Sequence, residues 1–530
     1  MRSNREYTFS QIPKVEVPRS SFRRSFAHKS TFNSGYLVPV FIDEVLPGDT
    51  FNVRAAVFAR LSTPIVPIMD NLRLDMFFFY VPLRLIWSNW QKFCGEQVNP
   101  GDSIDYQTPV VGSFVPGFTS LWDYFGLPVN QGAISPVAFH SRAYNLIYNE
   151  WFRDENLQNS LTVDKGDGPD NAANYYLRRR NKRHDYFTSC LPWPQKGAGV
   201  TLPLGTTAIV KTSGGDLVAG AQNQLRMSLA SDGTKLALGG AMGVSPTTGG
   251  VVAPSTGAPA GVGLYPANLY ADLSTATAAT INSLRQAFQI QRMQERDARG
   301  GTRYREILQS HFGVISPDAR LQRPEYLGGG TVPISFSAVP QTSATGLTGG
   351  ATPIGKVGAF AIAGGSGIGF SKSFVEHGVL LGLACVTADL TYQQGMPRMF
   401  SRRTRYDYYW PALAHLGEQA VLNKEIYYQA TAADDLVFGY QERWAEYRYR
   451  PSQITGIFRS TYATPLDFWH LSQKFVALPA LNSTFIEEDP PLQRVVAVAT
   501  EPHLIFDSFF EMTTVRCMPL YSVPGKIDHF

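Results

Sequence analysis

Strand-like segments stand near both ends of the 530-residue chain, and this placement limits the folds that the chain can adopt. Residues 51–57 alternate apolar and polar side chains in places, whereas residues 72–80 begin with alternation and end in a solid apolar run. Alternation is typical of a strand with one buried face, and a continuous apolar run is typical of a strand covered on both faces. Since strands from both ends can share one core, we expect a single β-sandwich with large insertions in its connections, and not a string of separate domains. The other strand candidates are 378–390, 436–449, 494–499 and a segment near 509–516.

The middle of the chain is predicted to hold two helices, at 141–152 and 280–299. In the second helix Ile281, Leu284 and Phe288 share one stripe. An apolar stripe at this spacing is more often part of a core than a cofactor-binding face, so we expect it to be packed.

Two stretches of the chain are rich in small residues. Residues 197–264 contain five charged residues and no Phe, Tyr, Trp or His, so they can build little core of their own. They are expected either to be disordered or to form a small β-rich excursion that neighbouring copies stabilise. Residues 328–369 are rich in glycine, and we expect this second stretch to face solvent as an inserted loop.

Charge is low in amount and uneven in position. Charged residues make up 17% of the chain and hydrophobic residues 44%, a composition that excludes a disordered tail, a collagen and a coiled coil. Residues 1–30 carry seven basic and two acidic residues, a net +5, whereas the whole chain carries +4 and the remainder therefore −1. Such a basic arm can contact nucleic acid or an acidic partner, or it can be a solvated terminus.

The sequence shows no constellation that would support catalysis, a cofactor or a metal ion, and we expect no enzyme activity. Residues 350–357 fit the spacing of a phosphate-binding loop but lack its final hydroxyl residue, and the four cysteines form no CxxC pair. The nine histidines lack metal-ligand spacing, and the carboxylates at 487–489 have no converging partner. The longest uncharged apolar stretch, 378–386, is far too short to cross a bilayer, so no membrane insertion is expected.

Arginine stands beside aromatic residues in three segments, 175–187, 398–410 and 443–450. Guanidinium groups neutralise phosphates and aromatic faces stack on unpaired bases, so this mixture suits single-stranded nucleic acid. The same residue types are enriched where subunits meet, and the sequence leaves both interpretations open. The candidate residues for nucleic acid or an interface are Arg19, Arg23, Arg24, Arg178, Arg179, Arg180, Lys182, Arg183, Arg402, Arg403 and Arg405.

Long blocks across nearly the whole chain are similar to one protein family, and the similarity fails only across about 200–265. In its motifs the chain resembles the major capsid proteins of the Microviridae, specifically the gokushovirus branch. The blocks that carry the resemblance are 30–39, 43–51, 79–87, 182–188, 191–197, 295–304, 316–329, 417–420, 438–443, 469–471 and 521–525.

The resemblance implies an eight-stranded viral jelly roll, an antiparallel β-sandwich with large inserted loops that carry short helices. It implies a homo-oligomeric T=1 icosahedral shell around circular single-stranded DNA, in the virion of a small tail-less bacteriophage assembled in the bacterial cytoplasm. It divides the chain into a basic arm (1–30), two parts of the jelly roll (31–196 and 265–530) and a variable insertion (197–264) expected to form a protrusion at the three-fold axes and to contact the host. A small basic DNA-condensing protein, a scaffolding protein and a host surface receptor are the implied partners.

Two other functions are compatible with a β-rich chain. A carbohydrate-binding or carbohydrate-cleaving β-sandwich is permitted by the Trp and Tyr content, but a converging carboxylate pair, a secretion signal and a disulfide pattern are missing. A monomeric protein that binds single-stranded DNA should be basic throughout, yet residues 31–530 sum to −1.

Overall fold

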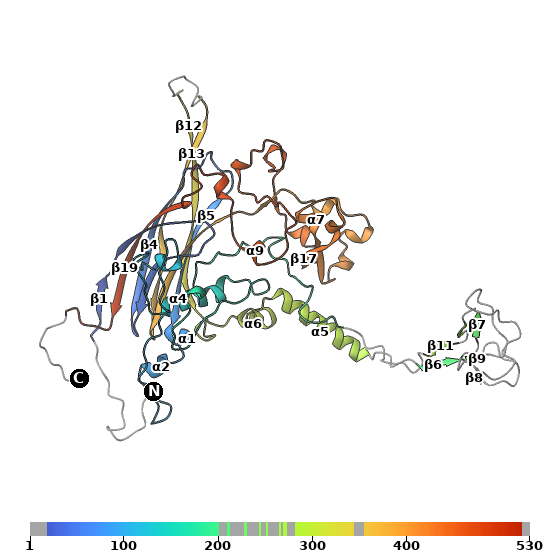
Figure 1. Ribbon diagram of the computed structural model, residues 1–530, viewed down its shortest axis with the longest axis horizontal. Helices are drawn as coiled ribbons and strands as arrows, with labels where there is room; N and C mark the ends of the chain where they lie inside the picture. The colour runs from blue at the N-terminus through green and yellow to red at the C-terminus, as the bar shows by residue number, and fades with distance from the viewer. Residues whose placement is uncertain are drawn as a thin grey trace. The chain divides into compact units, whose positions relative to one another are not determined.

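The computed structural model describes residues 18–200, 209–212, 227–229, 243–244, 251–252, 264–266, 269–272, 281–343 and 354–521. Long antiparallel strands from both ends of the chain form a two-layer sandwich (Figure 1). β1 and β2 pair with successive parts of one strand, β19, and so they fill a single position. The strands are β1 (Ser20–Arg23), β2 (Phe26–Phe32), β3 (Val38–Val45), β4 (Thr50–Leu61), β5 (Leu72–Pro82), β12 (Glu325–Pro340), β13 (Val357–Ser373), β14 (Gly378–Ala388) and β19 (Leu504–Arg516).

The order of the strands is that of a jelly roll. One layer, here called the β19 sheet, runs β1/β2–β19–β4–β13, and the other, the β14 sheet, runs β12–β5–β14–β3. All of these pairs are antiparallel, and β12 and β13 also pair with each other beyond the two layers. Strands distant in sequence are therefore neighbours in each layer, as in the double Greek key. The expected fold, a mainly β jelly roll with large inserted loops, is confirmed.

The core lies between the two sheets. β4 and β19 alternate buried and exposed residues along their length, and their buried residues face the β14 sheet. Phe510 of β19 stacks with Phe26 and lies 5.2 Å, between ring centroids, from Phe41. Burying aromatic side chains of this size is the main contribution to the stability of such a core.

The first insertion, between β5 and β12, covers the outer face of the β14 sheet. Helix α4 packs on β14, α1 on β5 and α3 on β3, and in Figure 1 β1 and β19 stand on the side of the sandwich away from α4. A second apolar cluster fills the space between this layer and the sheet, and for this reason every residue of β14 is buried. The helices are α1 (Leu83–Ile86), α2 (Trp90–Phe93), α3 (Leu121–Tyr124), α4 (Phe139–Ile147), the π-helix η2 (Tyr148–Phe152), the 3-10 helix η3 (Ala172–Asn174) and α6 (Tyr304–Phe312).

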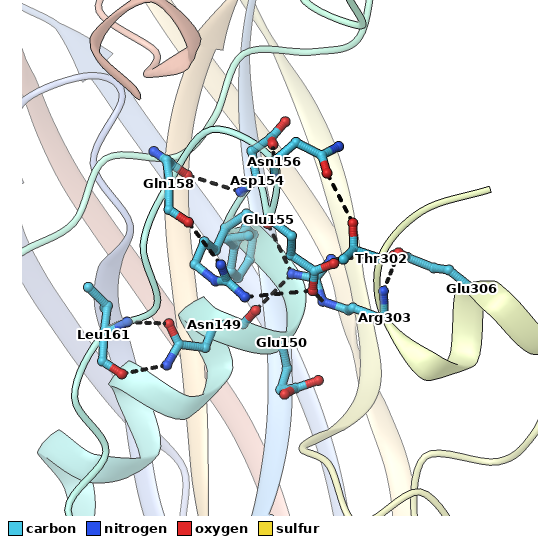
Figure 2. A network of polar contacts seen from close by, with 12 residues as sticks. Asn149, Glu150, Asp154, Glu155, Asn156, Gln158, Leu161, Thr302, Arg303 and Glu306 are labelled. Atoms are coloured by element: carbon cyan, nitrogen blue, oxygen red, sulfur yellow. Dashed lines mark hydrogen bonds and ion pairs between the residues drawn. The ribbon is translucent and has the colours of Figure 1, made fainter. Parts of the chain in front are cut away.

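A polar network ties the end of η2 to the start of α6 (Figure 2). The Nη2 of Arg303 donates to the carbonyl oxygens of Asn149 at 2.7 Å and Arg153 at 3.0 Å. Its Nε lies 2.7 Å from a carboxylate oxygen of Glu155. Burial raises the pKa of Glu155, and the guanidinium groups of Arg303 and Arg153 oppose this shift by stabilising the charged carboxylate. Arg303 thus satisfies backbone carbonyls and a carboxylate at the end of η2.

Residues Gln195–Arg296 form a compact unit of their own. Its described strands pair as short antiparallel ribbons, and α5 (Ile281–Arg299) includes its last residues. The predicted helix at 280–299 is confirmed, but the packing expected for its stripe is wrong, because Ile281 and Phe288 are 68% and 65% exposed. Most of the predicted variable insertion, 197–264, lies outside the described residues, so its role stays a prediction. The strands are β6 (Ile209–Thr212) with β11 (Leu269–Asp272), β7 (Met227–Leu229) with β10 (Leu264–Pro266), and β8 (Gly243–Val244) with β9 (Val251–Val252).

The second insertion, between β14 and β19, is built of short elements around a smaller apolar cluster. Its strands are β15 (Thr391–Tyr392), β16 (Glu418–Leu422), β17 (Val437–Glu442) and β18 (Ser452–Gln453). Its α-helices are α7 (Asn423–Ile426), α8 (Ala445–Arg448) and α9 (Ser483–Ile486). Its 3-10 helices are η5 (Arg398–Phe400), η6 (Arg405–Asp407), η7 (Pro411–Leu413), η8 (Ala432–Asp435), η9 (Gly456–Phe458), η10 (Asp467–Trp469) and η11 (Leu492–Arg494).

Several predictions of secondary structure need correction. The predicted strand at 436–449 ends as β17 at Glu442, because Trp444 has a left-handed backbone (φ 70°) and α8 follows. Residues 494–499 form no strand; Val495 and Val496 are apolar because they insert into the core from a loop. The helix at 141–152 and the strands at 51–57, 72–80, 378–390 and 509–516 are confirmed, with shifted ends.

The Gly-rich stretch 328–369 is the largest correction. It was expected to be a solvent-facing loop, yet its two ends belong to β12 and β13, the strands through which the two layers of the sandwich join. A Cβ on Gly369 would stand 1.9 Å from the carbonyl oxygen of Val53, and one on Gly329 would stand 2.2 Å from that of Met76. These two glycines are therefore required by the close approach of neighbouring strands, and not by loop flexibility.

Candidate functional site

Two of the three arginine-rich segments come together on the second insertion. The Nη2 of Arg402 lies 3.2 Å from a carboxylate oxygen of Glu446, and its guanidinium lies 4.2 Å from the ring centroid of Tyr447. Tyr409 meets Trp444 edge to face, with ring centroids 5.7 Å apart. Residues 398–410 and 443–450 thus form one surface, here called the arginine–aromatic face.

A tight turn holds the outer part of this face. The carboxylate of Asp407 accepts hydrogen bonds from the backbone N–H groups of Thr404 at 2.7 Å and Arg403 at 2.9 Å. These bonds favour the charged form and lower the pKa of Asp407 to about 2. Arg443 spans the two segments, because its Nη2 donates to the carbonyl oxygen of Tyr406 at 3.2 Å. The turn and this bond fix the directions of the neighbouring aromatic rings.

A buried charge cluster lies beneath the face. Arg398 stands 3.0 Å from Glu425 and 3.8 Å from Glu446, and the hydroxyl of Tyr186 donates to Glu425 at 2.9 Å. Burial raises the pKa of Glu425, and Arg398 opposes this shift. Because each carboxylate has both a cation and a neutral donor, the cluster is a fixed support whose charges are internally compensated.

A cavity of about 260 Å³ opens beside the cluster. Its walls combine aromatic rings with the guanidinium groups of Arg398, Arg402 and Arg450. The aromatic residues that line it are Tyr186, Phe187, Tyr392, Tyr447 and Tyr449.

The exposed part of the face is aromatic and cationic. Arg405 lies over the ring of Trp410, with 4.7 Å between guanidinium and centroid. Among the described residues no carboxylate forms an ion pair with Arg403, Arg405 or Arg450, whereas Arg402 is paired with Glu446. Such a surface can stack flat groups, bind anions or bury aromatic side chains of another chain. Its half-exposed or more exposed aromatic side chains are Phe400, Tyr406, Tyr408, Tyr447 and Tyr449.

The third segment turns its cations inward. Arg180 pairs with the buried Asp75, and Arg179 lies 2.7 Å from Asp489. The Nζ of Lys182 donates to the side chain of Gln473 at 2.9 Å and to a backbone carbonyl at 2.6 Å, and burial lowers its pKa. Arg178 lies over the ring of Tyr176 and Arg183 lies 3.6 Å from Asp75. All five cations thus contact groups of their own chain, and a nucleic-acid role for them stays a prediction.

The N-terminal candidates lie at the edge of the β19 sheet. Arg24 lies 2.8 Å from Asp43, and Arg23 lies 3.7 Å from Glu511 of β19. Arg19 donates to the carbonyl oxygen of Gly48. Lys29 of β2 lies 3.6 Å from Asp507 of β19, and the remaining basic residues of the predicted arm lie in 1–17, outside the described residues. Sequence reasoning could not identify Asp75, Glu446 and Asp489 as the partners of candidate arginines, because each lies more than 40 residues from its arginine in the sequence.

Within the described residues there is no group of His, Cys, Asp or Glu side chains that could hold a metal ion. No helix in the described ranges is both long and apolar enough to cross a membrane. The four cysteines are free thiols, and three of them are wholly or partly buried.

Comparison with known proteins gives the family. The model of the family described as "Capsid protein (F protein)" matches residues 10–526. The chain is 50% identical to Capsid protein VP1 of Bdellovibrio phage phiMH2K, over 99% of this chain and 98% of the relative. It is 44% identical to Capsid protein VP1 of Chlamydia phage 1, over 98% and 97% of the two chains, and 36% identical to that of Spiroplasma virus 4, over 98% of each. With the jelly roll already described, these similarities show that the chain belongs to the phage capsid protein (F protein) family and is a capsid protein of the gokushovirus type found in phage virions.

Proposed function

We propose that this capsid protein builds a T=1 icosahedral shell that encloses a circular single-stranded DNA genome. The observation that carries the proposal is the family match over residues 10–526 on a chain whose eight strand positions form a viral jelly roll. A jelly roll of this kind tiles a closed surface when copies meet through moderate interfaces, and closed symmetry needs only one kind of subunit.

Electron microscopy of the protein purified from infected cells tests this proposal. We expect uniform closed icosahedral particles whose nucleic acid resists nuclease until the particles are disrupted, and is then degraded by a nuclease specific for single strands. Particles of mixed size would contradict the T=1 shell, and particles that hold double-stranded DNA would contradict the genome type.

The variable insertion, residues 197–264, is proposed to form a surface protrusion at the three-fold axes and to contact a host receptor. Its lack of aromatic residues supports this proposal, since a segment that builds little core alone needs contacts with neighbouring copies to become ordered. Replacing 197–264 by a short Gly/Ser linker should leave closed particles that have lost their knobs and that bind host cells at least tenfold less well. Unchanged knobs would contradict the assignment. A small basic DNA-condensing protein and a scaffolding protein are the further proposed partners, and co-purification with particles and with assembly intermediates tests them.

The arginine–aromatic face is proposed as a contact between copies of the chain. Its support is the combination of exposed Tyr, Phe and Arg with a buried, charge-compensated base, which is typical of the centre of an interface. The double variant Tyr406→Ser/Tyr449→Ser should reduce the yield of closed particles by about tenfold. Tyr462→Ser is the matched control, because Tyr462 is similarly exposed, at 52%, and lies outside the face. Normal assembly with reduced packaged DNA would instead assign the face to nucleic acid.

A further inference from the structure

The two sheets of the sandwich differ in what lies on their outer faces. The first insertion covers the β14 sheet, but the outward residues of β4, from Asn52 to Arg60, are all exposed at every second position. β19 shows the same alternation, and the outward residues of the next strand, β13, are mostly exposed. In the part of the chain that the structure describes, the outer face of the β19 sheet carries no covering layer.

The register of the strands gathers aromatic and aliphatic side chains on this bare face. Phe58 stands between Asp507 of β19 and Gly364 of β13. Two residues further along β4, Arg60 stands between Ile505 of β19 and Ile362 of β13. Two residues before Phe58, Ala56 stands opposite Phe509 of β19. Phe58, Phe509 and Ile505 are 48%, 48% and 56% exposed. Since residues two positions apart on a strand share a face, these side chains form one continuous patch.

The floor beside Phe58 is shallow. Gly364 is its cross-strand neighbour, and an added Cβ at Gly364 would have no atom within 4 Å. Gly367 is equally open, and its positive φ of 78° accompanies an irregularity in the pairing of β13 with β4. Gly365, which directly follows Gly364, is different, because an added Cβ there would stand 2.5 Å from the side chain of Val332. Packing requires the glycine at 365 but not those at 364 and 367, which leave open space next to an exposed ring.

The charges on this face favour an anion. Asp507 and Glu511 are paired with Lys29 at 3.6 Å and with Arg23 at 3.7 Å. Arg54 and Arg60 are exposed, and no ion pair joins them to any carboxylate among the described residues. The edge strand β1 lies within the N-terminal residues 1–30, which carry a net +5 that includes Arg23 and Lys29.

We propose that the bare face of the β19 sheet is a stacking platform for unpaired bases of single-stranded DNA. Bases stack on Phe58 and Phe509 over the open floor at Gly364, while Arg54 and Arg60 contact the phosphates. This inference rests on the proposed function, because it takes the enclosed genome as the ligand. A second copy of the chain fits less well: it would have to place a carboxylate against each of two unpaired guanidinium groups, whereas every nucleotide of a DNA strand brings a phosphate.

Binding and crosslinking on the same protein test the platform. Capsid protein dissociated from purified particles is titrated with fluorescent oligothymidylate at fixed salt, and ultraviolet-crosslinked peptides from intact particles are identified by mass spectrometry. We expect Phe58→Ser/Phe509→Ser to weaken oligothymidylate binding by about tenfold. Arg54→Gln/Arg60→Gln should weaken binding and also flatten its dependence on salt concentration. The crosslinks of the unmodified protein should include peptides of β4 and β19.

Matched controls keep the inference separate from folding and from assembly. Phe118→Ser and Arg320→Gln change exposed residues elsewhere and should leave oligothymidylate binding unchanged. Equal affinity of the Phe58/Phe509 variant, or crosslinks that avoid β4 and β19, would overturn the platform. Loss of particles with unchanged oligothymidylate binding would also overturn it, and would assign the patch to a contact between copies. The proposed function fails separately, if particles contain no nuclease-protected single-stranded DNA.

Discussion

The β14 sheet and the β19 sheet share one core but meet different surroundings on their outer faces. β14 contains no charged residue and is buried throughout, because helices of the first insertion pack on it. β19 carries Asp507 and Glu511 on an alternating strand whose outer side is open. The insertion has therefore added a third layer to one side of a two-layer sandwich and left the other side bare. Sequence pattern follows this asymmetry in the middle of each sheet: a continuous apolar run marks β5 and β14, and alternation marks β4 and β19.

The largest expected effect comes from the buried ion pair in the covering layer. Arg142 and Asp170 are 0% and 1% exposed, and two guanidinium nitrogens of Arg142 bond to the carboxylate at 2.6 and 2.8 Å. Arg142→Ala leaves a buried carboxylate without its cation, so the free energy of unfolding should fall by about 3–5 kcal/mol. On the bare face Lys29→Ala should cost less than about 1 kcal/mol, because its partner Asp507 is half exposed. Urea denaturation followed by tryptophan fluorescence measures both, and similar losses would contradict the contrast.

A pair of phenylalanines compares the two outer faces directly. Phe79 of β5 is 1% exposed and packs against the covering layer, whereas Phe58 of β4 is 48% exposed. Phe79→Ala should lower the free energy of unfolding by about 3–5 kcal/mol, and Phe58→Ala by about 0.5 kcal/mol or less. The same denaturation experiment tests this. A large loss for Phe58→Ala in dissociated protein would mean that the bare face is packed in a single copy.

Adjacent glycines on β13 sharpen the comparison within one strand. A Cβ at Gly365 points inward and meets Val332 at 2.5 Å, whereas a Cβ at Gly364 points into open space on the bare face. Gly365→Ala should cost about 1–3 kcal/mol through overpacking. Gly364→Ala should change the stability by no more than about 0.5 kcal/mol. Thermal unfolding of the two variants is the measurement, and a reversed order would show that the faces are misassigned.

The smallest effect concerns pH and the covering layer. Burial lowers the pKa of His140 from its usual value of 6.5, and the nearby Glu44 opposes this shift. As the pH falls, His140 therefore takes up its proton in the unfolded chain before it does so in the folded one. Stability from His140 is therefore complete above about pH 6.5 and is lost as pH falls through the lower folded pKa. The contribution is at most about 1.4 kcal/mol per pH unit. His140→Gln should flatten the fall in urea midpoint between pH 7 and pH 5, and an unchanged slope would rule out this residue as the source.

The sequence was sufficient for the fold class but not for the layer arrangement. The apolar patterns at 51–57, 72–80 and 378–390 predicted strands, and the structure has β4, β5 and β14 there. β12 and β13 were missed, since their glycines serve close strand approach and look like loop residues in a sequence.

The candidate surfaces were only partly predictable for a related reason. Arginine beside tyrosine singled out 398–410 and 443–450, and the fold brings these two segments together. The pattern alone could show neither this meeting nor that Glu446 and Glu425 neutralise the arginines at the base of the face. The bare face gave no signal at all, because Phe58, Ile505 and Phe509 are far apart in sequence and meet only through strand register. Pairing between distant strands is the information that a local pattern lacks.

The pairing of β1 and β2 with β19 also sets the timing of folding during translation. Residues 20–32 find their neighbour only in residues 504–516, so the sandwich stays open until the ribosome has made nearly all of the chain. Until then the edge of β4 that pairs with β19 has no partner strand. A nascent chain that stops early has no closed sandwich to offer to a growing shell. Chains that end before the last described strand therefore cannot complete the β19 sheet.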